Sequence, residues 1–146
     1  MTFVLDASVA LSWLLEDAGA DQVYANSIFN SMKKPTAQAQ VPAIWGLEIA
    51  NVIAKSESRG LLLASRSQAF LNTLSALPIV CDFQTHANAL NNTLQLSRQH
   101  HLSAYDASYL ELAMRLGLPI ATLDGNLAKA ALKGGVARVA PASKRI

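Results

Sequence analysis

Two aspartates occupy positions from which a carboxylate could take part in catalysis. Asp6 follows the apolar run FVL and Asp124 follows PIATL, and each stands between an expected strand and the helix that comes next. In an open parallel sheet, ligands bind beyond the carboxyl ends of the strands. We therefore expect both carboxylates to face one crevice, although aspartate is also a favoured helix N-cap and Asp124-Gly125 is also a turn signal.

A third acid, Glu48, lies within a largely apolar helical segment. At helical spacing it shares a stripe with Ile44 and Val52, while Ile49 and Ile53 lie on the adjoining face. This pattern directs a carboxylate toward the interior, where an ionised group is costly unless it is paired or coordinates a metal. The alternative is that Glu48 reaches solvent or pairs with a base.

The fourth acid, Asp106, lies in the first turn of the segment DASYLELAMRLG. Ser103-x-x-Asp106 resembles a capping box, which by itself explains the residue. The apolar neighbours Ala107 and Leu110 predict a helix packed closely on the sheet. Such packing would hold the N-terminus of this helix at the sheet edge.

These four acids need a cation if they converge. Two unit charges about 4 Å apart repel by about 4 kcal/mol at an effective dielectric constant of about 20. A ligand set made only of oxygens, without cysteines or clustered histidines, suits Mg²⁺ or Mn²⁺. Such an ion lowers the pKa of a bound water and stabilises a departing oxygen. The chemistry indicated is hydrolysis of a phosphodiester.

The elements that would position the acids alternate between strands and helices. We expect strands over residues 2–5, around Val41, and over 79–81, 118–123 and 136–139. We expect helices capped by Ser8 and reaching Leu15, over 19–32, from Pro42 to a left-handed Gly60, and over 65–77, 85–100, 104–116 and 126–133. Because strands separated by helices need crossover connections, the predicted class is α/β, with a mainly parallel sheet of about four to five strands covered on both faces.

The composition indicates one globular domain over residues 1–146, with a frayed tail over 140–146. A hydrophobic fraction of 51% with 15% charged residues excludes a disordered chain. No run of about 18 apolar residues occurs, and the first apolar segment has no basic region before it, so we expect a cytoplasmic protein with no membrane span. Cys81, the single cysteine, is expected to be a buried small hydrophobe.

Several other polar or aromatic groups have structural explanations. His86, His100 and His101 lack metal-ligand spacing, and we expect structural or surface roles for them. Trp13 and Trp45 could stack on an unpaired base, but aromatic residues at helical spacing among apolar residues usually belong to a core or a dimer interface.

Two basic residues follow Glu48 along its helix. Lys55 lies two turns beyond it and Arg59 one turn further, so both could hold a substrate phosphate. Solvated positions near a helix end are the simpler explanation for both side chains.

Taken together, these segments resemble the PIN domain, specifically the VapC-type toxins of bacterial toxin–antitoxin systems. The matching pieces span nearly the whole chain and are VLDASVALSWLLED, VPAIWGLEIANVI and YDASYLELAMRLGLPIATLDGNLAKAA. The resemblance implies a PIN-like α/β/α sandwich, an endoribonuclease that depends on Mg²⁺ or Mn²⁺, a homodimer, and inhibition by a cognate VapB-like antitoxin.

The resemblance also implies roles for individual residues. Ser8 matches a small hydroxyl residue and Thr122 matches the family's Thr-x-Asp, which implies hydrogen bonds that support the carboxylates. Asn126 stands where many relatives carry another acid, which implies one tightly bound ion, with any second ion arriving with substrate. The residues that match the family's acidic quartet are Asp6, Glu48, Asp106 and Asp124.

Two other functions remain open on the sequence. One is a non-catalytic interaction module whose aspartates are caps, and the other is a nuclease that acts on DNA. The net charge of +2 arises from 12 basic and 10 acidic residues. With the four acids assigned to a metal site, 12 basic residues stand against 6 acidic ones, a balance that favours a phosphate backbone as partner.

Overall fold

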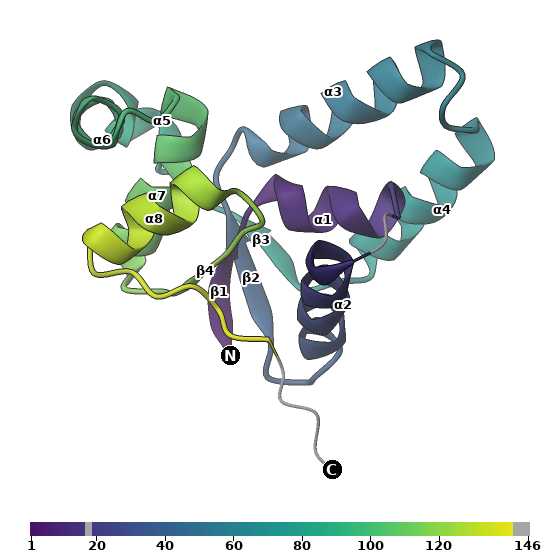
Figure 1. Cartoon of the computed structure of the whole chain (residues 1–146), viewed down its shortest axis with the longest axis horizontal. Helices are drawn as coiled ribbons and strands as arrows, with labels where there is room; N and C mark the ends of the chain where they lie inside the picture. The colour runs from purple at the N-terminus through teal and green to yellow at the C-terminus, as the bar shows by residue number, and fades with distance from the viewer. Residues whose placement is uncertain (17–18, 142–146) are drawn as a thin grey trace.

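The centre of the protein is a four-stranded parallel sheet. The computed structural model describes residues 1–16 and 19–141. The strands lie in the order β3-β2-β1-β4, and every paired neighbour is parallel (Figure 1). Their bounds are β1 Thr2–Leu5, β2 Gln38–Val41, β3 Ile79–Cys81 and β4 Ile120–Ala121. The predicted α/β class and parallel sheet are confirmed.

Helices cover both faces of this sheet. Their bounds are α1 Ala7–Leu14, α2 Ala20–Met32, α3 Trp45–Ser58, α4 Ala64–Ser75, α5 Thr85–Asn88, the π-helical turn Ala89–Thr93, α6 Leu94–His100, α7 Ala104–Leu116 and α8 Gly125–Lys133. Figure 1 places α7 and α8 on one side of the strands and α1 and α2 on the other. The result is a three-layer α/β/α sandwich.

Alternation along β1 divides the core between the two faces. Val4 packs in a cluster with buried residues of α7 and α8, whereas Phe3 and Leu5 pack in a cluster with residues of α1 and α2. Successive side chains of a strand point to opposite faces, so a strand that is apolar throughout contributes to both layers. All three residues are fully buried, which fixes the end of β1 and the acid that follows it.

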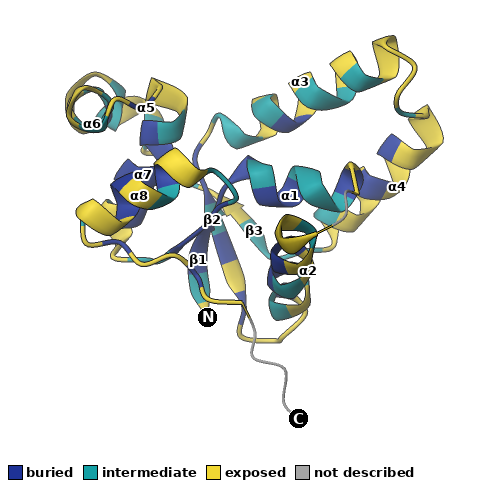
Figure 2. Cartoon of the chain, viewed as in Figure 1, coloured by how far each residue is buried: buried dark blue, intermediate teal, exposed yellow. Residues whose placement is uncertain are grey.

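Helices α3 and α4 form an arm that extends from the sandwich (Figure 1). Ile49 is the buried residue of α3, and it packs with Phe70 of α4 and Ala10 of α1 in a third cluster. Most other positions of α3 and α4 are partly or fully exposed (Figure 2). Gly60 follows α3 with a φ of 71°, the left-handed conformation predicted for it.

The predicted strand over residues 136–139 is wrong. This segment makes one isolated parallel bridge, between Arg138 and Ile120, and β4 itself has two residues rather than the expected span 118–123. The Val139 N–H donates to the Ile120 carbonyl, and then the chain leaves the sheet. The Arg138 side chain donates from Nε to the Thr122 carbonyl and stacks over the Tyr24 ring.

Three local predictions also need correction. The first helix begins at Ala7 with Asp6 as its N-cap, so Ser8 lies inside the helix and does not cap it. The turn at Pro42 precedes α3, which begins only at Trp45, because the Trp45 N–H closes that turn on the Pro42 carbonyl. Cys81 is exposed rather than buried, since β3 is an edge strand of the sheet.

The remaining predicted helices are present. The segment 85–100 is helical, although a π-helical turn at Ala89–Thr93 separates α5 from α6. The predicted frayed tail lies, over residues 142–146, outside the described residues. Within the described part of the chain, no helix combines the length and apolar character that a membrane span needs.

Candidate active site

Asp6 is held at the carboxyl end of β1 by two hydroxyl groups. Its side chain is buried, and Oδ2 accepts hydrogen bonds from Ser8 Oγ at 2.6 Å and from Thr122 Oγ1 at 2.7 Å. Thr122 follows β4, the parallel neighbour of β1, so the two strands end side by side. Parallel pairing thus brings residues 116 positions apart in sequence to one carboxylate.

Asp124 lies beside Asp6 at the beginning of α8. It is the N-cap, and its Oδ1 accepts from the Leu127 N–H at 2.8 Å, as expected for a capping aspartate. The Asp124 N–H donates to Thr122 Oγ1 at 3.0 Å, and the Leu123 N–H donates to Ser8 Oγ at 3.0 Å. The two hydroxyls therefore bind both the Asp6 carboxylate and the backbone that presents Asp124.

Glu48 reaches the same region from α3. It is half-buried, and its Oε1 accepts a 2.6 Å hydrogen bond from the hydroxyl of Tyr109. Tyr109 lies on α7 and is fully buried, and its hydroxyl also accepts a 3.4 Å hydrogen bond from the Ala7 N–H. Burial and the nearby carboxylates of Asp6 and Glu48 raise the pKa of Tyr109, so this hydroxyl keeps its proton and acts as the donor.

Tyr109 is a residue that the sequence analysis missed. Its position three residues after Asp106 puts both on one side of α7, which is the signal that could have identified it. An aromatic residue in an apolar helix is also what a core requires, so the sequence does not separate the two roles.

Asp106 lies in the first turn of α7. Its N–H donates to Ser103 Oγ at 3.1 Å, which confirms the predicted N-cap of this helix. A hydrogen bond between the Ser103 side chain and the carboxyl acts to lower the pKa of Asp106, but burial and the charges of Asp6 and Asp124 outweigh it and raise the pKa. The carboxylate therefore faces other acids as well as its own cap.

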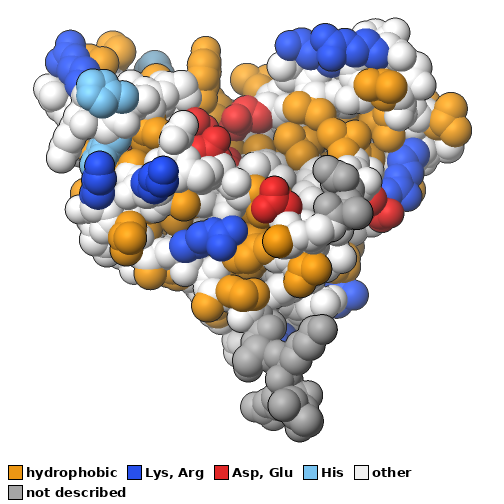
Figure 3. Space-filling view, viewed as in Figure 1, with side chains coloured by type: hydrophobic (Ala, Val, Ile, Leu, Met, Phe, Trp, Pro, Cys, Tyr) orange, Lys and Arg blue, Asp and Glu red, His pale blue; other side chains and the backbone are white. Residues whose placement is uncertain are grey.

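Burial and mutual repulsion act on the acids together. Burial is the largest cause of the raised pKa of Asp6, with a further contribution from Asp124, while Ser8 and Thr122 act in the opposite direction. Burial likewise raises the pKa of Glu48, with added contributions from Asp6 and Asp106, against the hydrogen bond from Tyr109. Asp6, Glu48 and Asp106 therefore have raised pKa values, and the charge of Asp124 contributes to those of Asp6 and Asp106. Figure 3 shows acidic side chains in the hollow between the α3 arm and the α5–α6 region.

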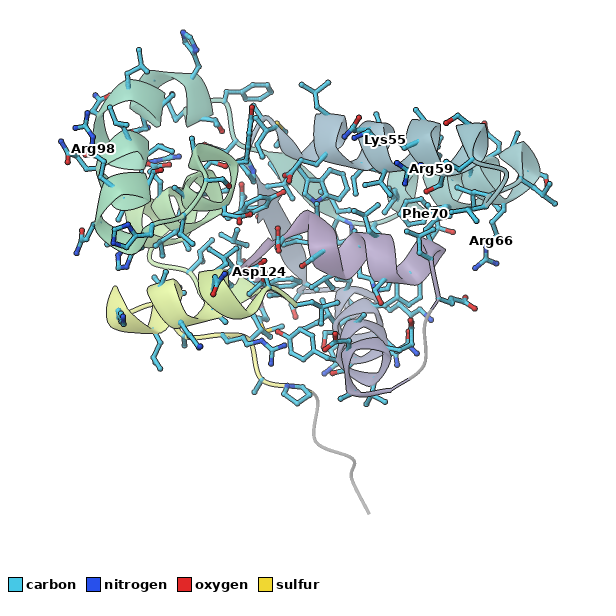
Figure 4. All side chains as sticks on the ribbon, turned by 45° about the horizontal axis from the view of Figure 1, so that its top comes forward. Lys55, Arg59, Arg66, Phe70, Arg98 and Asp124 are labelled. Atoms are coloured by element: carbon cyan, nitrogen blue, oxygen red, sulfur yellow. The ribbon has the colours of Figure 1, made fainter. Side chains whose placement is uncertain are left out.

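No basic side chain neutralises this cluster within the described residues. The ion pairs there join Arg66 to Glu16 and Arg115 to both Asp82 and Glu111. Neither Lys55 nor Arg59 forms one with the acids. Lys55 is exposed near the end of α3 and Arg59 is exposed directly after it (Figure 4). At the helical rise of about 1.5 Å per residue, both lie about 10 Å or more from Glu48 along the helix axis.

The donor set fits a hard divalent cation. All four groups supply carboxylate oxygens, the ligand type that Mg²⁺ and Mn²⁺ prefer. Within residues 1–16 and 19–141, no group of three or more His, Cys, Asp or Glu side chains is arranged so that it could hold a metal ion by itself. Mg²⁺ does not need such a group, because it keeps several waters and is usually bound through one or two carboxylates.

The other residues singled out in the sequence lie elsewhere. Trp13 packs against the core, donates from Nε1 to the Ala25 carbonyl at 2.8 Å and meets Phe29 edge to face. Trp45 packs against all three core clusters. Asn126 is exposed and, together with His100 and His101, lines a separate pocket beside α8.

Comparison with known proteins identifies the family. The model of the PIN domain family matches residues 3–133. Ribonuclease VapC3 from Pyrobaculum aerophilum is 27% identical over 132 residues, which cover 88% of this chain and 94% of that protein.

Solved structures share the fold. The crystal structure of PAE2754 from Pyrobaculum aerophilum superposes with a TM-score of 0.62 at 21% identity, covering 89% of this chain and 87% of the other. The crystal structure of FitAcB from Neisseria gonorrhoeae gives a TM-score of 0.60 at 20% identity, covering 97% and 98%. Since the family model spans nearly all of the sandwich described above, the chain belongs to the PIN domain family.

Proposed function

We propose that this PIN domain is a metal-dependent endoribonuclease and the toxin of a toxin–antitoxin pair. The observation that carries the proposal is a cluster of buried and half-buried carboxylates in which burial and the neighbouring acids raise the pKa values of Asp6, Glu48 and Asp106. Among the described residues, no basic side chain forms an ion pair with this cluster. Such a cluster is unfavourable by itself and gains stability from a bound divalent cation. The similarity to Ribonuclease VapC3 supports RNA as the substrate.

Asp6, Glu48, Asp106 and Asp124 would hold Mg²⁺ or Mn²⁺. When bound, such an ion supplies an activated water and stabilises the departing oxygen of a phosphodiester. Ser8 and Thr122 orient Asp6 by donating to one of its oxygens, Oδ2. Asn126 is exposed on α8 and adds only a neutral amide, which agrees with one tightly bound ion.

Glu48 has one carboxylate oxygen that remains available for proton transfer. Tyr109 donates to Oε1, so Oε2 is the oxygen that this hydrogen bond does not use. Burial raises the pKa of Glu48, which makes its carboxylate a stronger proton acceptor. We assign to Oε2 the acceptance of a proton from the attacking water.

Three further features belong to the proposal. We propose that residues 1–146 form a single PIN domain, because Trp45 packs against all three core clusters.

A cognate VapB-like antitoxin would bind the toxin in the cytoplasm. The toxin itself would be a homodimer, supported by exposed apolar side chains at the start of α3, on either side of α5 and at the start of α7, namely Leu47, Phe83, Leu90 and Tyr105.

The test compares substrates and metals. Purified protein is incubated with a single-stranded RNA and with DNA of the same sequence, in Mg²⁺, in Mn²⁺ and with chelator. We expect endonucleolytic cleavage of RNA that requires a divalent ion. Cleavage of DNA alone would assign the nuclease to DNA. Absence of cleavage, together with no divalent-ion binding by calorimetry, would leave the chain as an interaction module.

The antitoxin assignment has a separate test. We expect a short reading frame beside this gene whose product, expressed with the toxin, forms a complex with it and abolishes cleavage. A neighbouring gene that encodes no such binding protein would remove the toxin assignment without affecting the nuclease chemistry.

A further inference from the structure

A polar pocket lies beside the acidic cluster, between the end of α6 and the outer face of α8. Its volume is about 500 Å³, and its lining residues are Gln99, His100, His101, Asn126, Lys129, Ala130 and Lys133. Figure 3 shows Lys, Arg and His side chains gathered over this side of the molecule. The pocket contains no acidic lining residue, in contrast to the neighbouring hollow.

The two lysines of this pocket lie one helical turn apart on α8. Like charges at this spacing destabilise a helix slightly. The helix dipole accounts for Lys133, which lies in the last turn, but not for Lys129 in the middle. Neither lysine belongs to an ion pair in the part of the chain that the structure describes. Both are exposed and available to an external anion.

The opposite wall of the pocket contains a strained residue. His101 ends α6 with a φ of 54°. Among the residues that the structure describes, it is the only one other than glycine with a positive φ. Glycine or asparagine usually occupies this place, since the left-handed conformation costs about 1–2 kcal/mol for other residues. Strain of this kind is found at functional sites, where the side chain has a use that offsets its cost.

The pocket begins at the end of α8 that Asp124 caps. Asn126, in its lining, follows Asp124 by two residues in the first turn of that helix. Measured along the helix axis, Lys129 lies about 7 Å and Lys133 about 13 Å from Asp124. A chain that crosses the acids and continues along α8 would meet Asn126 first and then the two lysines.

We propose that this pocket binds the phosphate backbone of the single-stranded RNA substrate on one side of the bond that is cut. The inference rests on the proposed nuclease function and names the path of the substrate away from the acids. Lys129 and Lys133 neutralise phosphates, while the Asn126 amide and the histidine ring nitrogens supply hydrogen-bond donors. Contacts of this type position the strand and carry no sequence information.

The test measures the salt dependence of RNA binding. A labelled single-stranded oligoribonucleotide is titrated with protein at about 50 to 200 mM salt and constant Mg²⁺, with all proteins carrying Asp6→Asn to prevent cleavage. The variant Lys129→Ala/Lys133→Ala is compared with Lys33→Ala/Lys34→Ala. The control pair follows α2, precedes the amino end of β2 and is likewise exposed, although Lys33 also lies over the Phe29 ring. Both variants lose two positive charges, so net charge is matched.

We expect the pocket variant to bind RNA more weakly and to reduce the slope of log affinity against log salt by about 1.4, since each phosphate contact to a single strand contributes about 0.7. The control pair should leave the slope unchanged. In the cleaving protein, the pocket variant should raise KM several-fold with kcat unchanged, because the contacts lie away from the reacting bond.

Two results would overturn the inference, and they are distinguishable. Equal slopes for the pocket and control variants, while the unsubstituted protein cleaves RNA, would remove the pocket assignment and leave the nuclease intact. Absence of RNA cleavage by the unsubstituted protein would remove the proposed function, and with it the assignment of the bound strand as a substrate, whatever the slopes.

Discussion

The hydroxyl of Tyr109 donates a 2.6 Å hydrogen bond to Oε1 of Glu48, and this bond connects the centre of α7 to the first turns of the α3 arm. The arm otherwise contacts the sandwich chiefly through apolar residues around Ile49. The hydrogen bond therefore determines where the Glu48 carboxylate lies relative to Asp6 and Asp106, which come from the sandwich itself.

The first prediction concerns this contact. Tyr109→Phe removes a hydrogen bond that lowers the pKa of Glu48, so burial and the neighbouring acids should raise that pKa further. Glu48 would then stay protonated to higher pH, and the acid limb of the pH–rate profile should move to higher pH. The folded state should lose about 1 kcal/mol of stability. Tyr105→Phe, at an exposed tyrosine one residue before Asp106, is the matched control and should change neither. A pH–rate profile that coincides with that of the control would show that Tyr109 only fills the core.

The second prediction concerns Thr122, which is fully buried and bonds both aspartates at the sheet edge. Thr122→Val keeps the shape but removes a donor to Asp6 and leaves the Asp124 N–H without its acceptor. We expect a loss of about 1–3 kcal/mol in the free energy of unfolding, and a loss of about 10–100-fold in activity or metal affinity. Thr122→Ser, which retains the hydroxyl, should stay within a few-fold of the unsubstituted chain. Equal activities of the valine and serine variants would exclude a supporting role for the hydroxyl.

The third prediction concerns the ion pair that joins β3 to α7. Arg115 bonds both oxygens of Asp82, at 3.2 and 2.6 Å, and also bonds Glu111. Burial acts to raise the pKa of Asp82, but the hydrogen bonds and charge of Arg115 outweigh it, so the pKa lies below its ordinary value of 3.8. Because the pKa of Asp82 is lower in the folded chain than in the unfolded chain, its ionised carboxylate stabilises the folded state at pH values above 3.8. This stabilisation is lost as the pH falls through the folded-state pKa.

Asp82→Asn should accordingly cost about 2 kcal/mol near neutral pH, and the difference from the unsubstituted chain should shrink as pH falls below 3.8. Denaturant unfolding across pH measures both effects. The matched control is Glu16→Gln at the exposed pair with Arg66, which should cost less than about 0.5 kcal/mol. A destabilisation of Asp82→Asn that is constant down to pH 2 would contradict the assignment to charge.

The fourth prediction concerns self-association. Phe83 and Leu90 are 88% and 86% exposed and stand on either side of α5. Exposed apolar side chains that gather in one patch mark interaction surfaces. Replacing both by serine should convert a dimer into a monomer, as measured by size-exclusion chromatography with light scattering. Leu132→Ser changes a comparably exposed residue on α8 and should leave the dimer intact. A dimer that survives the double substitution would place the interface elsewhere.

The sequence allowed prediction of those features that depend on local backbone pattern. Asp6 and Asp124 follow apolar strands, and the parallel crossover rule places the ends of neighbouring strands together. The capping of α7 by Ser103 and of α8 by Asp124 follows from residue type and spacing. Such features need no knowledge of which segments meet in space.

Features that depend on tertiary contacts could not be predicted. Tyr109 bonds a residue 61 positions away, and an aromatic residue in an apolar helix gives no sign of that partner. The apolar pattern over residues 136–139 suits a strand, yet Arg138 instead bonds the backbone of Thr122 and stacks on Tyr24. A free cysteine usually behaves as a small buried hydrophobe, but the strand that contains Cys81 lies at the edge of the sheet. The local sequence does not reveal the order of the strands.

The central claim is that the carboxylate cluster holds a divalent ion that RNA cleavage requires, and Asp6→Asn tests it most directly. Cleavage of a single-stranded RNA is measured over a Mg²⁺ titration for the unsubstituted chain, for Asp6→Asn, and for Asp21→Asn, which alters an exposed aspartate on α2 by the same change. The account predicts metal-dependent cleavage by the unsubstituted chain and by Asp21→Asn, and a loss of at least about 100-fold for Asp6→Asn across the titration. Cleavage by Asp6→Asn at the rate of Asp21→Asn, or cleavage that persists in chelator, would contradict it.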